Sequence, residues 1–132
     1  MTVAILAAAT LAVLVFVLGF NVSRLRGITA KAGGTQMPTD PTDRLFIAIR
    51  AHGNAAEYVP TLMVLFLVVG ARSPAAVAVA LIVGATLARL VHAFGMLTAS
   101  SLAAESALRL AGAIGTYVFG IGLAIAAAAS LL

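Results

Sequence analysis

Four long apolar stretches set the strongest limit on how this chain can fold. They cover residues 3–20, 45–70, 74–97 and 110–132 of a 132-residue sequence. Each approaches or exceeds the roughly 20 residues that a helix needs to cross the hydrocarbon core of a bilayer. Charged residues make up only 9% of the chain, against about 25% in ordinary soluble domains. The sequence therefore predicts an all-α integral membrane protein, folded as a bundle of four transmembrane helices.

We expect a single membrane domain over residues 1–132. Its helices are predicted at about residues 2–25, 43–71, 74–97 and 102–131, with a loop at 26–42. The first apolar stretch has no basic residues before it and no convincing cleavage site after it, which favours a retained helix over a signal peptide. Asp40 or Asp43 is expected to cap the second helix, and Ser100 or Ser101 the fourth.

The loop at residues 26–42 and its flanks are the most basic part of the chain. Arg24, Arg26 and Lys31 lie there, whereas the turn between the second and third apolar stretches carries only Arg72. Because basic loops stay on the cytoplasmic side, this loop is predicted to be cytoplasmic and both chain termini to lie on the outer side of the membrane.

Composition excludes several kinds of site. The chain has no cysteine, so it forms no disulfide and carries no thiolate metal site or thiol nucleophile of its own. Its two histidines and one intramembrane glutamate match no metal-ligand spacing, so no metal is expected. The net charge of +4 is spread over helix ends and loops without an aromatic-rich basic surface, so no nucleic-acid partner is expected either.

Residues 50–60, which read RAHGNAAEYVP, place charged and polar groups at the start of the second apolar stretch. At roughly 100° per residue, Arg50, Asn54 and Glu57 fall within about 60° of one another on a helix, while His52 points to a different side. A charge at the centre of a bilayer costs from about 2.5 to over 10 kcal/mol, so such residues usually face a protein interior or a wet cavity. This polar stripe is therefore predicted to face a binding site.

Two further helices bring charge toward the same side of the membrane. Arg89 and His92 share a face of the third helix, and Arg109 lies near the start of the fourth. Polar residues that converge in a helix bundle usually mark a ligand pocket. Two alternatives stay open: a salt-bridge network that only fixes an oligomer, and a proton relay through Glu57 and His92.

The pattern RAHxNxxEYxP at residues 50–60 resembles the signature of the MAPEG family, the membrane-associated proteins in eicosanoid and glutathione metabolism, and specifically its small bacterial members. The resemblance extends to the Arg89-x-x-His92 and Arg109-x-x-Gly112 steps, to the four-span layout and to the length. It implies a homotrimer in the bacterial inner membrane. Glutathione would be the co-substrate, held between neighbouring subunits near the cytoplasmic side.

The resemblance also implies roles for individual residues. Glutathione-binding positions correspond to Arg50, His52, Asn54, Glu57, Tyr58, Arg89 and His92. Arg109 matches an arginine credited with stabilising the thiolate, which makes it the catalytic candidate, although an ungapped alignment would place Glu105 there. Met96 stands where well-characterised eicosanoid enzymes have a tyrosine.

The implied activity is that of a glutathione transferase or peroxidase. Its second substrate would be a lipophilic electrophile or lipid hydroperoxide that enters from the bilayer. The alternative is a non-catalytic trimeric scaffold that binds a lipid or another membrane protein.

Overall fold

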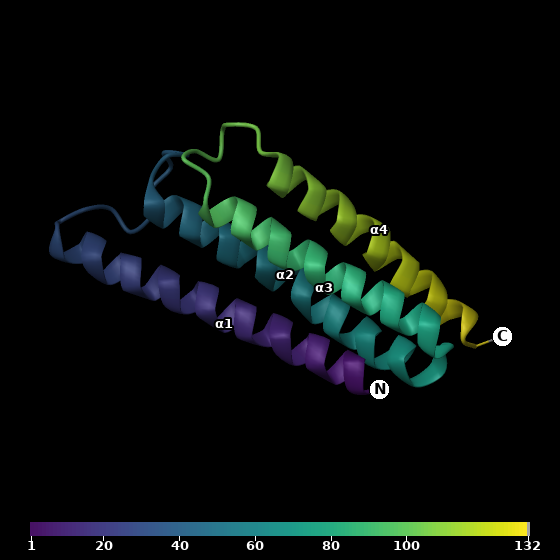
Figure 1. Ribbon diagram of the computed structural model, residues 1–132. Coiled ribbons are helices and arrows are strands. Elements are labelled where there is room, and N and C mark those ends of the chain that lie inside the picture. The colour runs from purple at the N-terminus through teal and green to yellow at the C-terminus, as the bar shows by residue number, and fades with distance from the viewer. Residues whose placement is uncertain (132) are drawn as a thin grey trace.

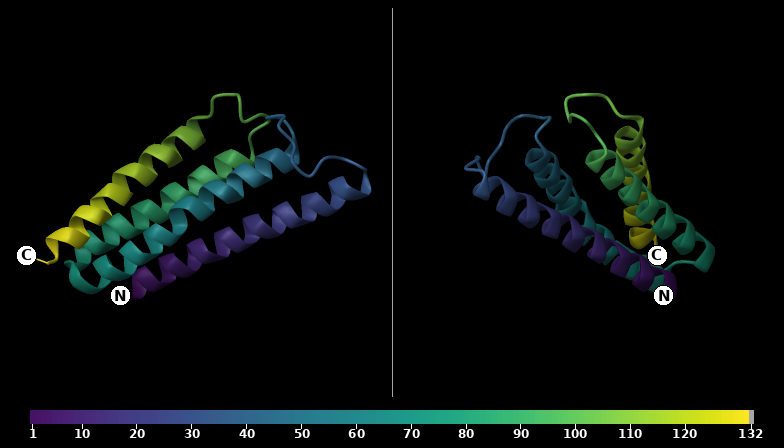
Figure 2. Two further views of the ribbon diagram at one scale, coloured as in Figure 1. Left: turned by 180° about the vertical axis from the view of Figure 1, so that it is seen from behind. Right: turned by 60° about the vertical axis from the view of Figure 1, so that its left-hand side comes forward.

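The computed structural model describes residues 1–131, which fold into a bundle of four long helices (Figure 1). The helices are α1 (Thr2–Lys31), α2 (Arg44–Arg72), α3 (Ala75–Leu97) and α4 (Ala107–Ala129). All four are long and apolar enough to cross a membrane. Both termini lie at the same end of the bundle as the α2–α3 turn, and the two longer loops lie at the other end (Figures 1 and 2). The predicted all-α bundle of membrane-spanning helices is confirmed.

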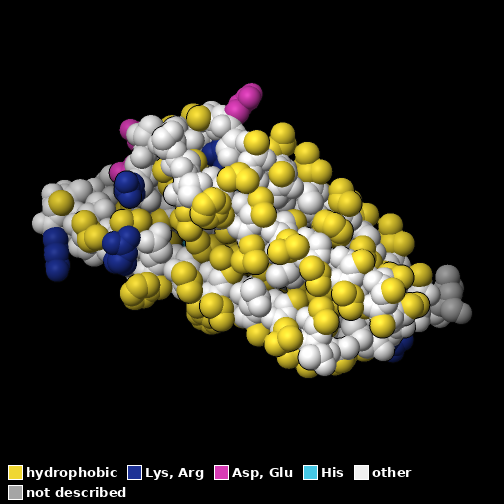
Figure 3. Space-filling view, viewed as in Figure 1, with side chains coloured by type: hydrophobic (Ala, Val, Ile, Leu, Met, Phe, Trp, Pro, Cys, Tyr) yellow, Lys and Arg dark blue, Asp and Glu magenta, His cyan; other side chains and the backbone are white. Residues whose placement is uncertain are grey.

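The bundle has a thin core and an apolar outside. Its central layer is built from branched and aromatic side chains that are almost fully buried, among them Leu11, Phe66, Ile82 and Leu123. Hydrophobic side chains also cover the outer surface along the helices, and the charged groups gather mainly at the end that carries the two longer loops (Figure 3). Apolar surface on this scale would be a liability in water, and it is the surface that lipid contacts require.

Helix α1 is longer than its hydropathy indicates. The prediction placed its end near residue 25, but α1 continues to Lys31. Helix formation does not need apolar side chains, so α1 continues through Gly27 and ends only at the turn that contains Gly33. That glycine adopts a left-handed conformation with φ of 68°, and the next N–H donates to the carbonyl of Thr29 at 2.9 Å. This turn ends the helix, as glycine does at many helix termini.

Side-chain caps decide where α2 and α4 begin. The carboxylate of Asp43 accepts from the N–H groups of Leu45 and Phe46 at 2.7 and 3.0 Å, so α2 starts immediately after it. Helix α4 starts at Ala107 rather than at the predicted residue 102, because its N-cap is Ser106, not Ser100 or Ser101.

The segment before α4 is held in a loop by its neighbour. The N–H of Leu102 donates to the carbonyl of Pro41 at 2.9 Å, which ties this segment to the α1–α2 loop. In the α1–α2 loop the hydroxyl and the N–H of Thr42 both donate to Asp40. These contacts, mainly that of the hydroxyl, hold the pKa of the Asp40 carboxyl below its usual value. The two loops thus form one connected end of the bundle.

Candidate functional site

The two charged residues of the α2 stripe face away from the rest of the bundle. Arg50 and Glu57 are exposed, whereas Ala55 and Val59 on the opposite side of the helix are buried. Within residues 1–131, no salt bridge or side-chain hydrogen bond engages Arg50 or Glu57. The single chain therefore presents a positive and a negative group, unpaired, on the outward face of an apolar helix.

Arg89 is the largest nearly fully buried side chain, at 1% exposure. Its Nη2 donates to Oδ1 of Asn54 at 2.7 Å, and its Nη1 donates to Oγ1 of Thr116 at 3.5 Å. The guanidinium carbon lies 5.2 Å from the centre of the Tyr58 ring, and Nε has no partner among the described residues. The cation is thus held by neutral groups from α2 and α4, an amide, a hydroxyl and an aromatic face.

Two residues of α4 that the sequence reading did not assign to the site contribute to this cluster. The Tyr117 hydroxyl lies 3.3 Å from that of Tyr58. The Thr116 hydroxyl donates to the carbonyl of Gly112 at 2.7 Å, which leaves its lone pairs for the buried guanidinium. The signal was present in the spacing, since Arg109, Gly112 and Thr116 recur every three or four residues along one face.

Beside the tyrosine pair, α2 and α4 enclose an apolar hollow of about 250 Å³. Its polar end is formed by Tyr58, Thr61, Thr116 and Tyr117. Its other lining residues are apolar or small: Leu62, Leu65, Gly120, Ile121 and Ala124. The hollow can take a small lipophilic group with two phenolic hydroxyls near its head.

His92 and Arg109 form a separate contact between α3 and α4. The Nδ1 atom of His92 lies 2.9 Å from the carbonyl oxygen of Arg109, and its backbone packs directly against Gly112. The guanidinium of Arg109 donates to the carbonyl of Ala104 in the loop before α4. Within residues 1–131, it makes no hydrogen bond to the Arg89 cluster. The ionisable groups that the sequence places on one side of the membrane thus do not all meet within one chain. They are Arg50, Glu57, Arg89, His92 and Arg109.

His52 lies on another side of α2, as its helical angle predicts. It packs against α1 so closely that a Cβ at Gly19 would lie 3.2 Å from its Nε2. Together with Arg26 it lines a hollow of about 540 Å³ between α1 and α2. In residues 1–131 no group of three or more histidine, cysteine or acidic residues lies close enough to hold a metal ion.

The motif at residues 50–60 therefore displays the charges of Arg50 and Glu57 outward, while Asn54 and Tyr58 contact α3 and α4. The sequence matches the profile of the MAPEG family over residues 4–129. The chain belongs to the MAPEG family. No curated protein matches it. Membership makes it an integral membrane protein of glutathione and eicosanoid metabolism, and the resemblance noted from residues 50–60 is confirmed.

The structure shows where the two residues lie at which this MAPEG chain departs from the expected pattern, Met96 and Glu105. Met96 is half-buried and packs against a small cluster that includes Leu18 and Ala93. Glu105 is exposed and precedes the cap of α4, whereas Arg109 lies in the first turn of that helix. The two alternative matches to the catalytic arginine position thus have different settings in this MAPEG member: Arg109 lies at a helix start and Glu105 in a loop.

Proposed function

We propose that this protein is a glutathione transferase or peroxidase that acts on lipophilic electrophiles or lipid hydroperoxides. The observation that carries the proposal is the pair of unpaired, exposed charges of Arg50 and Glu57 on a membrane-spanning helix. Such charges are too costly to face lipid. A zwitterionic peptide with extra negative charge, as glutathione is, neutralises both.

The spacing of the two charges fits a tripeptide. Arg50 and Glu57 are two helical turns apart, which is about 10.5 Å along the axis at 1.5 Å per residue. Three extended residues span about 10–11 Å. Arg50 would then bind a carboxylate and Glu57 the ammonium group, both as charge-assisted hydrogen bonds. Asn54 lies between them along the helix. Arg89 would not contact the tripeptide directly but would hold Asn54 and Tyr58 in place.

A second subunit completes this site in our proposal. The hollow with Arg26 and His52 lies on another face of the same chain. In a cyclic homotrimer each interface joins two different faces of neighbouring subunits. The α2 stripe of one subunit would meet the Arg26 and His52 hollow of the next, with glutathione between them. We place this end of the bundle on the cytoplasmic side, with both termini outside, as the basic loop indicates.

Arg109 would stabilise the thiolate. A free thiol has a pKa near 8.5, and each unit of depression needs about 1.36 kcal/mol of preferential stabilisation of the thiolate. A guanidinium has five N–H donors, so the contact of Arg109 with Ala104 leaves others for sulfur. The thiolate displaces chloride from an activated aryl chloride to give a thioether. With a hydroperoxide the sulfur attacks the terminal oxygen and the O–O bond breaks. The alkoxide takes a proton from water to give an alcohol, and the sulfur becomes a sulfenic acid, which a second thiol converts to disulfide and water.

The lipophilic substrate would enter from the bilayer. The hollow at Tyr58 and Tyr117 is apolar along most of its length and lies between α2 and α4, next to the Arg89 cluster. A reactive carbon or peroxide at its polar end would lie close to the α2 stripe. The apolar walls select for lipophilicity more than for one particular compound.

The second candidate is a non-catalytic trimeric scaffold. Two observations favour it: the Arg109 guanidinium is already engaged by the Ala104 carbonyl, and Met96 packs into a core cluster where catalytic relatives offer a hydroxyl. The scaffold would retain the interfaces and bind lipid or another membrane protein without activating a thiol.

Arg109→Ala separates the two candidates. The purified protein is mixed with glutathione and chlorodinitrobenzene, and thiol binding, thiolate absorbance and conjugate formation are followed separately. An enzyme keeps binding in the variant and loses thiolate absorbance and turnover by about 100-fold, the usual cost of removing one preorganised charge-stabilising donor. Arg72→Ala is the matched control, because Arg72 is the last residue of α2 and lies at the end of the bundle away from Arg109. This variant should behave as the parent. Parent protein that binds glutathione but shows neither thiolate nor turnover, with every substrate tried, supports the scaffold.

A further inference from the structure

A third hollow lies outside the proposed glutathione site. It has a volume of about 820 Å³ and opens at the loop end of the bundle, between α1, the start of α2 and the end of α3. None of its lining residues belongs to the α2 stripe, the Arg89 cluster or the His92–Arg109 contact. The proposed thiol chemistry gives it no role.

The rim of this hollow is basic. Arg24 of α1 and Arg44 at the start of α2 both line it, and no acidic side chain does. The two nearby carboxylates are engaged elsewhere, since Asp43 caps α2 and Asp40 accepts from Thr42. Arg24 uses Nη2 to donate to Asn21 at 3.0 Å, which holds its side chain along the rim and leaves further donors.

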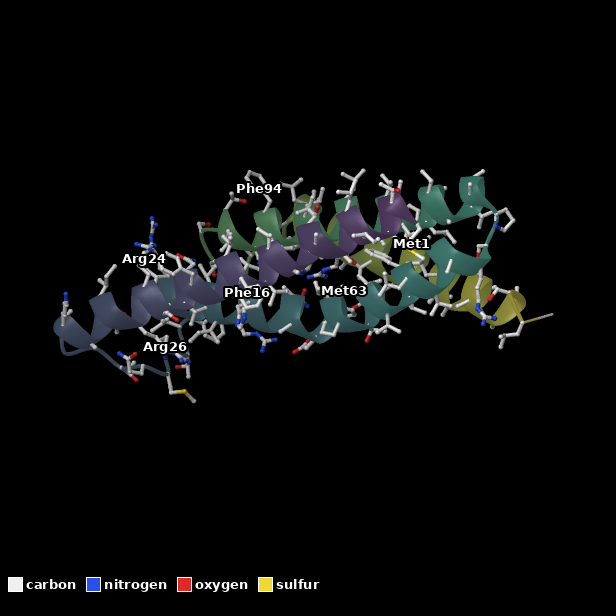
Figure 4. All side chains as sticks on the ribbon, turned by 90° about the horizontal axis from the view of Figure 1, so that it is seen from below. Met1, Phe16, Arg24, Arg26, Met63 and Phe94 are labelled. Carbon is white, nitrogen blue, oxygen red and sulfur yellow. The ribbon has the colours of Figure 1, made fainter. Side chains whose placement is uncertain are left out.

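Below the rim the wall is apolar. It is formed mainly by Val17, Leu18, Phe20, Ile47, Ala48 and Leu97. Toward the membrane centre the hollow is closed where Leu18 packs with Ala51 and Ala93. Arg24 extends from α1 on the side where Phe94 of α3 also lies, while Arg26 extends to the opposite side (Figure 4). Arg24 therefore lines this hollow, whereas Arg26 lines the hollow that contains His52.

The depth of the rim matches a phosphate layer. From Thr2 to Arg24 a helix rises about 33 Å at 1.5 Å per residue. The hydrocarbon core of a bilayer is about 30 Å thick. Arg24 thus reaches the level of lipid headgroups when α1 spans the membrane. Anionic lipid phosphates are attracted to basic groups at that surface, and arginine binds phosphate with paired N–H donors.

We propose that this hollow binds one anionic phospholipid of the surrounding bilayer. Its phosphate lies against Arg24 and Arg44, and an acyl chain runs down the apolar wall. The volume falls within the range of about 300–1,000 Å³ that is usual for ligand pockets. The lipid contacts α1, α2 and α3 at the end where the two longer loops are joined by the Leu102–Pro41 hydrogen bond. The proposal is independent of any thiol chemistry.

Native mass spectrometry of the full-length protein in detergent tests this. The probes are palmitoyl-oleoyl phosphatidylglycerol, the matching phosphatidylcholine and glycerol phosphate, each added over a concentration series. We expect tight binding of one phosphatidylglycerol per chain, weaker binding of phosphatidylcholine and no competition from glycerol phosphate at equal concentration. The variant Arg24→Gln with Arg44→Gln should bind phosphatidylglycerol roughly 30-fold more weakly. Lys31→Gln with Arg72→Gln removes the same charge elsewhere and should keep the parent affinity.

A second variant tests the apolar wall with both arginines intact. Val17→Trp fills the hollow from its exposed side, so lipid binding should fall without any change in charge. Equal affinity for phosphatidylcholine and phosphatidylglycerol in the parent, or an unchanged affinity in both Val17→Trp and the double arginine variant, overturns the proposal. Glycerol phosphate that competes as well as the lipid overturns it too, because the site then binds an anion and not a lipid.

Discussion

Arg89 of α3 donates a 2.7 Å hydrogen bond to Asn54 of α2 and thereby joins two helices inside the membrane span. Asn54 lies between Arg50 and Glu57 along the axis of α2, and its amide oxygen accepts a hydrogen bond from the buried guanidinium of Arg89. The motif residue is thus both a structural contact and a neighbour of the proposed tripeptide. Stability and binding are coupled at this position.

Asn54→Ala should destabilise the fold. The variant leaves one donor of a nearly fully buried guanidinium without a partner, which costs about 1–3 kcal/mol or more for a charged group. Reversible unfolding in mixed micelles measures the loss. Asn21→Ala is the control, because it breaks a similar amide–arginine contact between Arg24 and Asn21 at the surface of α1 and should cost under about 0.5 kcal/mol. Equal effects of the two variants would show that the Arg89 contact is not formed.

Gly112→Ala should loosen the α3–α4 pair. A Cβ at Gly112 would lie 2.5 Å from the backbone nitrogen of His92, which is backbone and cannot move aside cheaply. We expect a loss of about 1–3 kcal/mol from overpacking, measured by unfolding in mixed micelles. Gly120→Ala on the same helix is the control, since its nearest neighbour is a Leu62 methyl group at 3.8 Å. That control should be neutral or up to about 1 kcal/mol more stable because alanine favours helix.

The sequence was sufficient for the four spans and for the faces of α2, because both follow from hydropathy and the helical period. It predicted that Arg50, Asn54 and Glu57 share a side and that His52 does not. It did not predict the register between helices. That register depends on long-range packing, such as the close approach of Gly112 to His92, and it decides that Arg89 meets Thr116.

The helix ends were harder to predict than the spans. Local chemistry fixes them: a left-handed Gly33 ends α1, and the Ser106 cap together with the Leu102–Pro41 contact delays α4. The orientation of Arg109 could not be predicted from the sequence either. Its guanidinium donates to the carbonyl of Ala104, and the position of that loop carbonyl depends on where α4 begins.

Glu57→Gln should weaken glutathione binding selectively. Glu57 is exposed and free of partners among the described residues, so the substitution removes a charge without breaking an internal contact. If Glu57 binds the ammonium group, affinity falls about 10- to 100-fold, the value of a hydrogen bond to a charged group. Calorimetric titration with glutathione and with its deaminated analogue makes the test specific. The analogue should bind the parent and the variant equally, and a parallel loss for both ligands would contradict the assignment.

Mixed trimers should recover glutathione sites that neither parent variant has. The proposal places Glu57 of one subunit opposite His52 of the next, so Glu57→Ala and His52→Ala should each abolish or strongly weaken binding alone. When the two variants are co-expressed in equal amounts, a site is intact only where a chain with Glu57 precedes a chain with His52. In a cyclic assembly this holds for about a quarter of the sites. Glutathione binding to the co-purified mixture, counted by titration, measures that fraction. A site contained within one subunit gives no recovery, because every chain then lacks one of the two groups, and full binding by His52→Ala alone would remove His52 from the site.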